Sequence, residues 1–201
     1  MQNTAATVSL AFTIGTYLVY AYYYYVDAQK PQKEQKFPPA KVTWFIWASV
    51  DAVIASAMLG GGYFAPQMWV YVAGSGAIAI YDFYRDPHHF ALSKIDKYVL
   101  GFAGLAMILW YLTSGVAAIA ISLVAVIVGS FPLWRATWKN PRTIPWIPWA
   151  VFLAGGIAGA ISSVQLHGWT WIDDLGPCAF LVAQVFTLAI ALPIRQPRTT
   201  T

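Results

Sequence analysis

Residues 39–48 read PAKVTWFIWA, and residues 141–150 read PRTIPWIPWA, at a constant offset of 102 residues. The correspondence continues without a gap from 39–85 to 141–187, where it also pairs Trp69 with Trp171 and Gly74 with Gly176. Three shared tryptophans rarely coincide by chance because tryptophan is a rare residue. In an apolar chain, a repeat of this length predicts two copies of a helical bundle in a membrane, and it places the functional site between the two halves.

The composition indicates an integral membrane protein. Hydrophobic residues make up 59% of the 201 residues and charged residues only 10%, and the mean hydropathy is +0.57. Soluble domains average about 25% charged residues. A soluble protein of this size could not bury so much apolar surface.

Seven apolar segments are long enough to predict transmembrane helices, since a span needs about 20 mostly apolar residues. The turn between the fourth and fifth segments rests on Thr113, Ser114 and Gly115, which interrupt an almost continuous apolar run. The fold class expected is therefore all-α and polytopic. The predicted spans are 4–26, 42–60, 64–84, 97–113, 115–134, 145–163 and 172–194.

The basic residues alternate between the predicted loops. They follow the first, third, fifth and seventh spans, and the other loops have no Lys or Arg. The positive-inside rule then predicts an outer N-terminus and a cytoplasmic C-terminus, in a membrane such as the bacterial inner membrane. Both copies of the repeat begin at a cytoplasmic loop, so they cross in the same direction. We expect a first three-helix bundle in 1–85, a linker helix in 86–114 and a second three-helix bundle in 115–201.

This parallel layout resembles the SWEET sugar transporters and the wider PQ-loop family. The run from Phe131 to Lys139 is similar to the end of a first helix in a PQ-loop bundle, with Pro132-Leu133 in place of the Pro-Gln pair. The resemblance implies that Pro132 is a hinge for alternating access, because proline permits a bend in a membrane helix. The first half departs from the family, since its first helix has no proline. No asparagine occupies the third helices, where the family binds sugar; the nearest residues are Gly74, Ser75, Gly176 and Cys178.

Polar residues at membrane depth are the candidate substrate-binding residues, since such groups are costly and are usually functional or paired. Asp51 lies near the middle of the second span. It could bind a solute hydroxyl or exchange a proton there, or it could make a structural hydrogen bond or remain a protonated carboxyl group. Ser56 and Ser75 lie deep in the second and third spans, although small polar residues also permit close helix packing. Asp82 and Gln184 are repeat partners that could line a cytoplasmic vestibule, and Asp82 could instead pair with Arg85.

Tryptophans and tyrosines gather near the predicted span ends, and we interpret them as aromatic belts at the membrane surfaces. The set includes Tyr22 to Tyr25, Trp44, Trp47, Trp134, Trp138, Trp146 and Trp149. No enzyme motif is present. We expect no cofactor and no metal site, because the adjacent His88 and His89 have no third ligand at a suitable spacing.

Two functions remain open from the sequence. The first is a SWEET-like facilitator that moves a small polar solute, such as a sugar, by alternating access between the two bundles. The second is a non-catalytic accessory subunit of a larger membrane complex, built on the same transporter-like fold. The partners expected are lipids and a small solute, together with further copies of the chain or a larger complex, and no nucleic acid.

Overall fold

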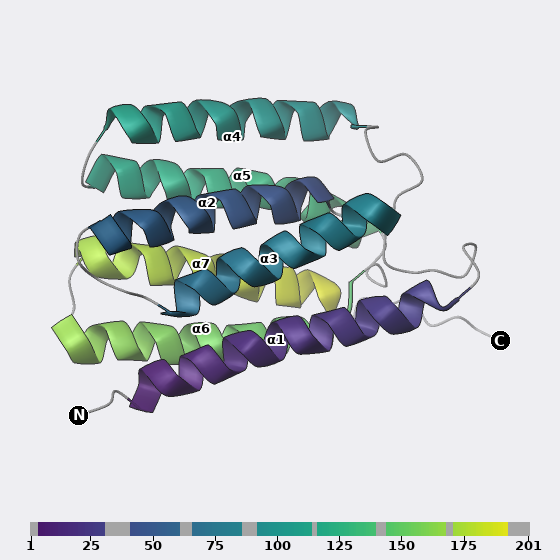
Figure 1. The fold of residues 1–201 in the computed structure, drawn as a ribbon, viewed down its shortest axis with the longest axis horizontal. Helices are drawn as coiled ribbons and strands as arrows, with labels where there is room; N and C mark the ends of the chain where they lie inside the picture. Colours follow the sequence, from purple (N-terminus) through teal and green to yellow (C-terminus); the bar gives the residue numbers. More distant parts are fainter. Residues whose placement is uncertain are drawn as a thin grey trace.

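The computed structural model describes residues 4–30, 41–60, 66–85, 92–113, 116–139, 144–167 and 171–192. These residues form helices and short irregular ends, with no strand among them, so the all-α class is confirmed. The helices match the seven predicted apolar segments to within a few residues (Figure 1). They are α1 Thr4–Ala28, α2 Lys41–Gly60, α3 Pro66–Arg85, α4 Lys94–Leu112, α5 Val116–Lys139, α6 Trp146–His167 and α7 Trp171–Ala191.

Local sequence signals explain several helix ends. The backbone N–H of Asp96 donates to Ser93 Oγ (3.1 Å) and the N–H of Ser93 donates to Asp96 Oδ2 (2.9 Å), a reciprocal capping box at the start of α4. Proline is favoured at the first position of a helix, as at Pro66, because the missing N–H has no helical partner there. The predicted break after Thr113 is confirmed, since α4 ends at Leu112 and α5 begins at Val116.

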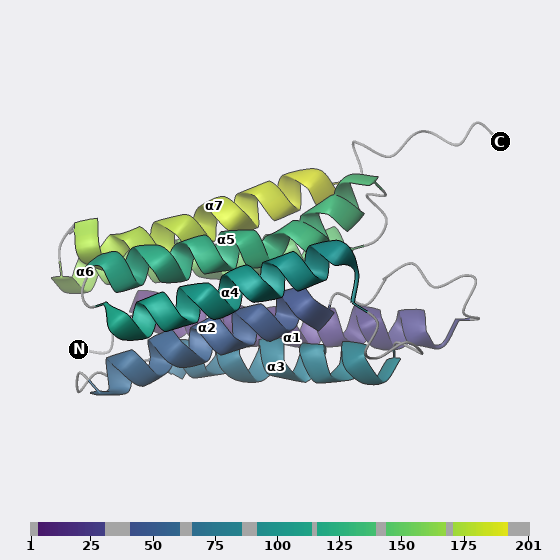
Figure 2. The ribbon, with the colours of Figure 1, turned by 90° about the horizontal axis from the view of Figure 1, so that it is seen from above.

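Six of the helices pack in a closed ring. The order of contacts is α1, α3, α2, α5, α7, α6 and back to α1, while α4 lies outside this ring against α5 and α2. The two views of the ribbon show this arrangement, with α5, α6 and α7 on one side and α1, α2 and α3 on the other (Figures 1 and 2). The ring order is unchanged when α1, α2 and α3 are exchanged with α5, α6 and α7. The packing therefore follows the repeat in the sequence.

All basic side chains of the described part lie at one end of the helices. Successive helices run in opposite directions, so α1, α3, α5 and α7 end where α2, α4 and α6 begin (Figure 1, right). The opposite ends of the described helices carry no Lys or Arg. We call the first the basic end; its described cations are Lys30, Lys41, Arg85, Lys94, Lys97, Arg135 and Lys139.

The outer surface of the ring is strongly apolar. Large apolar side chains such as Leu18 (67% exposed), Ile108 and Val182 point away from the neighbouring helices. Soluble monomers rarely expose contiguous apolar patches larger than a few hundred Å². Among the described residues, two helices have the length and composition to cross a membrane, Thr4–Ala28 and Trp146–Gln165.

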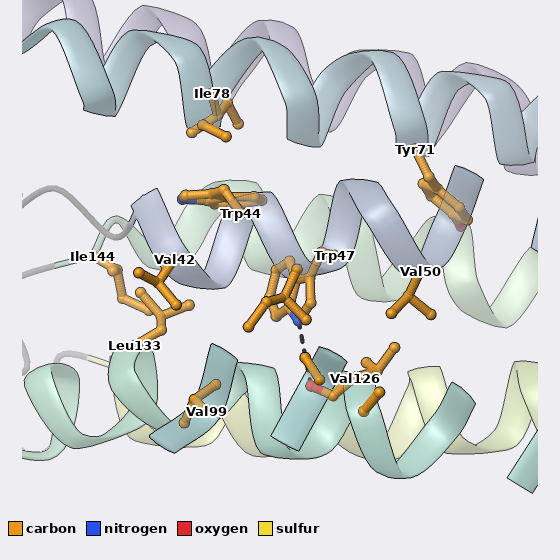
Figure 3. Packing of buried hydrophobic residues seen from close by; sticks show 14 of the residues in the cluster. Val42, Trp44, Trp47, Val50, Tyr71, Ile78, Val99, Val126, Leu133 and Ile144 are labelled. Carbon is orange, nitrogen blue, oxygen red and sulfur yellow. Dashed lines mark hydrogen bonds between the residues drawn. The ribbon is translucent and has the colours of Figure 1, made fainter. Parts of the chain in front are cut away.

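The tryptophans correct one prediction. The aromatic-belt interpretation was wrong for Tyr24, which is buried, and for Trp44, Trp47 and Trp149, which are buried as well. The rings of the three tryptophans meet between the halves, with centroid distances of 5.0 Å for Trp44–Trp47, 5.7 Å for Trp47–Trp149 and 6.3 Å for Trp44–Trp149. We call these three residues the tryptophan cluster; Figure 3 shows its α2 members among the buried residues around them. Trp138 and Trp146 are exposed, as a belt requires.

Candidate functional site

The inner face of α1 is polar along its whole length. Every fully buried side chain of this helix carries an oxygen atom, and its large apolar side chains, Phe12 and Leu18 among them, face outward. The buried residues recur every three or four positions, so they form a single line on the helix. We call this line the polar stripe: Ser9, Thr13, Thr16, Tyr20, Tyr24 and Asp27. The sequence analysis missed the stripe, although its spacing is visible in the sequence.

The polar stripe begins against glycines of α6. Ser9 Oγ donates to the carbonyl oxygen of Gly155 at 2.8 Å, an interhelical hydrogen bond. A Cβ atom at Gly159 would lie 3.0 Å from Ser9 Oγ, and one at Gly155 would lie 3.0 Å from Phe12 Cβ. The two helices therefore approach closely because α6 has no side chains at these positions, as is typical of small residues at membrane helix contacts.

Asp51 lies halfway along α2 and faces the interior. It is 3% exposed, and its Oδ1 atom is buried with no hydrogen-bond partner among the described residues. It is close enough to Tyr17 and Tyr71 for an electrostatic interaction with both. Lys41, the only cation on α2, lies ten residues away, about 15 Å along the helix. The carboxyl group is therefore buried among polar aromatic side chains without a cation beside it.

Tyr17 connects Asp51 to Ser75. Tyr17 Oη and Ser75 Oγ are 2.9 Å apart, and the same hydroxyl donates to the carbonyl oxygen of Tyr71 at 3.4 Å. The Tyr17 ring lies directly on Gly74, where any added Cβ atom would overlap the ring. Gln67 donates through Nε2 to the hydroxyl of Tyr71 and to Thr13 Oγ1, the latter at 3.4 Å. The structure thus places one predicted site residue, Ser75, in a hydrogen-bonded group, and a second, Asp51, within electrostatic range of two tyrosines of that group.

Aromatic rings from the second half face this group. Phe152 of α6 lies 6.2 Å from Tyr17 and 5.5 Å from Tyr71 between ring centroids, and Phe180 of α7 stacks on Tyr71 at 6.3 Å. Trp149 lies one turn before Phe152, at 5.8 Å. The repeat partner of Asp51 is Leu153, so only the first half contributes a carboxyl group, while the second half contributes rings that contact Tyr17 and Tyr71.

Gln184 of α7 lies at about the same depth along the helices as Asp51. It is buried against Gly156, where an added Cβ atom would overlap the Gln184 side chain, and its Oε1 atom has no hydrogen-bond partner among the described residues. Gly156 lies ten residues into α6, as Asp51 lies ten residues into α2. The sequence suggested a cytoplasmic vestibule for Gln184 and Asp82. Both are instead buried, so neither lines an open vestibule in this structure.

Asp82 belongs to a second polar group near the basic end. It is fully buried and interacts electrostatically with Tyr20 and Tyr24 of the polar stripe. Arg85, for which the sequence suggested Asp82 as a partner, makes an ion pair with buried Asp27 at 3.2 Å and lies over the Tyr24 ring at 5.6 Å. This group joins α1 to α3 at the end of the first half.

Two other predicted residues lie apart from Asp51. Ser56 is exposed on α2, so the structure does not bring it into the site. Pro132 lies inside α5, which continues to Lys139. Two residues earlier on α5, Ser130 Oγ accepts a hydrogen bond from Trp47 Nε1 at 3.2 Å. The same nitrogen donates to the Val126 carbonyl oxygen at 3.4 Å (Figure 3). These contacts fasten α2 to α5 near the proline.

Within the part of the chain that the structure describes, no three His, Cys, Asp or Glu side chains gather as metal ligands. His88 and His89 lie outside the described residues. No family model matches this sequence, and neither a curated protein nor a solved structure matches it significantly.

Proposed function

We propose that this chain is a polytopic membrane protein that carries a small polar solute by alternating access. Two parallel three-helix bundles form the moving halves, and α4 is the linker that reverses the chain between them. The ring order, which is unchanged on exchange of the halves, supports this arrangement. The basic end would face the cytoplasm by the positive-inside rule, in the inner membrane of a bacterium.

The observation that carries the proposal is the polar stripe. A helix that only packs against neighbours in a membrane needs small or apolar residues on its inner face. Burying a hydroxyl or carboxyl group costs free energy unless a hydrogen bond compensates it. Here α1 buries six such groups in a line. Ser9, Thr13, Thr16 and Asp27 have hydrogen-bond or ion-pair partners, whereas the Tyr20 hydroxyl makes no hydrogen bond of standard geometry among the described residues. A lining for a polar solute accounts for this pattern.

Asp51 and its neighbours are the proposed solute site. They lie halfway along the helices and between the halves, as an alternating-access mechanism requires. The tryptophan cluster and Tyr20 would close the path on the side of the basic end, since Tyr20 contacts Trp44 at 5.0 Å and Trp149 at 6.3 Å. Pro132 would be the hinge of the second half.

Uptake into liposomes that contain the purified protein tests this proposal. The solutes to compare are radiolabelled glucose, glycine and ethylamine, which represent neutral, zwitterionic and cationic compounds. We expect uptake of at least one of them above that of protein-free liposomes, reduced tenfold or more by Asp51→Asn. Ser56→Ala, on the exposed side of the same helix, is the matched control and should not change uptake. Uptake equal to protein-free liposomes for every solute would contradict transport of these solute classes.

A second candidate is the accessory subunit of a larger membrane complex. It is favoured by the aromatic packing that fills the space between the halves near the basic end, and by the exposed aromatic side chains of α4, where Tyr111 is 82% exposed. Purification from the native membrane in a mild detergent separates the two proposals. A fixed-ratio complex with other proteins would favour the accessory role, and a monomer or small homo-oligomer would favour transport.

A further inference from the structure

The proposed transport function leaves the chemical class of the solute open, and the buried groups around Asp51 narrow it. We infer that the solute is a small organic cation with a primary ammonium group, held by Asp51 and by the cluster of aromatic rings that contains Tyr17 and Tyr71. That the bound cation is a transported solute rests on the proposed function. Its binding, however, can be measured without any transport.

Charge is the first argument. Buried charges in proteins are paired or bind a cation. The groups that interact electrostatically with Asp51 are Tyr17 from α1 and Tyr71 from α3, and both are neutral in their ordinary state. Among the described residues, α5 has no ionisable side chain before Arg135, and all Lys and Arg side chains lie at the basic end. Without a cation, a buried carboxyl group favours its neutral, protonated form. A bound ammonium group would stabilise the carboxylate, which a neutral sugar would not.

Hydrogen-bonding capacity is the second argument. Asp51 Oδ1 and Gln184 Oε1 are acceptors at the same depth, and neither receives a hydrogen bond from the described residues. The hydroxyl group of Tyr17, which interacts electrostatically with Asp51, is a further acceptor. An ammonium group has donors and no acceptor. Its hydrogen-bonding pattern therefore complements the atoms that remain unsatisfied.

The aromatic rings are the third argument. Tyr17, Tyr71, Phe152 and Phe180 form consecutive ring contacts between 5.5 and 6.3 Å. Ring faces attract cations through the negative potential above the ring, and aromatic side chains with a nearby carboxylate are a common way to bind ammonium groups. The same rings would attract the hydroxyl-rich surface of a sugar less strongly, since that surface carries no charge.

The test is binding of ethylammonium chloride to the purified full-length protein in detergent, measured by calorimetry and by quenching of tryptophan fluorescence. Sodium chloride at the same concentration and glucose are the comparison ligands. We expect saturable binding of ethylammonium that neither sodium chloride nor glucose reproduces. Asp51→Asn should weaken this binding at least tenfold, Asp51→Glu should retain most of it, and Ser56→Ala should leave it unchanged.

A second variant keeps the test decisive if Asp51→Asn fails to fold. Phe152→Leu removes one ring and should weaken ethylammonium binding several-fold without removing the carboxylate. Equal binding of sodium would show an inorganic cation site, and preferred binding of glucose would show a sugar site; either result overturns the inference. Ethylammonium binding without uptake in liposomes would refute transport and leave the cation site standing. Glucose uptake without ethylammonium binding would support transport and overturn the cation site.

Discussion

The indole rings of Trp47 and Trp149, which are repeat partners, meet edge to face with their centroids 5.7 Å apart. A residue and its repeat partner can touch only where the two halves face each other across their common axis. The contact between these two residues therefore marks that axis near the basic end. Because each half contributes one of the rings, separation of the halves at this end would have to break this contact.

Truncation of Trp149 tests how firmly this contact holds the halves together. We expect Trp149→Ala to lower the free energy of unfolding by about 3–5 kcal/mol, because the substitution leaves a large cavity between buried rings. Unfolding in increasing SDS, followed by circular dichroism, measures the effect. Trp146→Ala is the matched control, since Trp146 is 39% exposed and its loss opens no internal cavity. Similar losses in the two variants would argue against a special role for the buried ring.

Gly74 tests the placement of Tyr17 beside Asp51. Gly74→Ala puts a methyl group into the Tyr17 ring, and such overpacking costs about 1–3 kcal/mol. The displaced ring would also lose the hydrogen bond to Ser75. Gly104→Ala on α4 is the control, because an added Cβ atom there meets nothing within 4 Å and alanine favours a helix by about 1 kcal/mol. We expect the two substitutions to change the SDS midpoint in opposite directions.

The Asp27–Arg85 ion pair gives a third prediction. Removal of one partner of a buried ion pair costs about 3–5 kcal/mol because a buried charge loses its partner. Arg85→Gln should therefore destabilise the protein strongly, and Asp27→Asn in the same chain should recover part of the loss. Lys30 approaches Asp27 at 3.4 Å but its side chain is 38% exposed, so Lys30→Gln should cost no more than about 1 kcal/mol. An additive double variant would show that Asp27 and Arg85 act independently.

Pro132 gives a prediction in which stability and transport change in opposite directions. Proline inside a helix removes one backbone hydrogen bond, so Pro132→Ala should leave stability unchanged or raise it. If the bend is a hinge, the same substitution should slow uptake into liposomes several-fold. Pro66→Ala, at the first position of α3, is the control and should change neither quantity. Normal uptake by a stabilised Pro132→Ala variant would remove the hinge from the mechanism.

The helices were predictable from the sequence because each depends on a long apolar run and on local signals. The break after Thr113 depends on such a signal, and the structure confirms it. The gathering of Lys and Arg at one end follows from the same runs, since it requires only that successive helices reverse direction. These properties depend on residues near each other in the chain.

The site was only partly predictable, because burial depends on which helices become neighbours. Asp51 and Ser75 were identified as deep polar residues, but Tyr17, which interacts with both, belongs to a helix in which no site residue was predicted. Ser56 was included for its depth, and depth says nothing of the direction in which a side chain points on a helix. Trp44 and Trp149 were assigned to the membrane surfaces because they lie near the ends of predicted spans, and this position also says nothing of the direction in which a side chain points. In each case, the order in which the helices pack decides whether the side chain is buried, and its position along the helix does not.

The polar stripe also affects how the protein is made. α1 is synthesised first, yet it packs most extensively on α6, which leaves the ribosome more than a hundred residues later. At about 5–20 residues per second, this delay is on the order of ten seconds. Thr13 and Thr16 donate to carbonyl groups of α1 itself, but Ser9 lacks its acceptor on α6 during that time. If the chain is inserted into a membrane, as we propose, lipid cannot replace that acceptor, and the insertion machinery or an early contact with α3 would have to shield Ser9 until the sixth helix arrives.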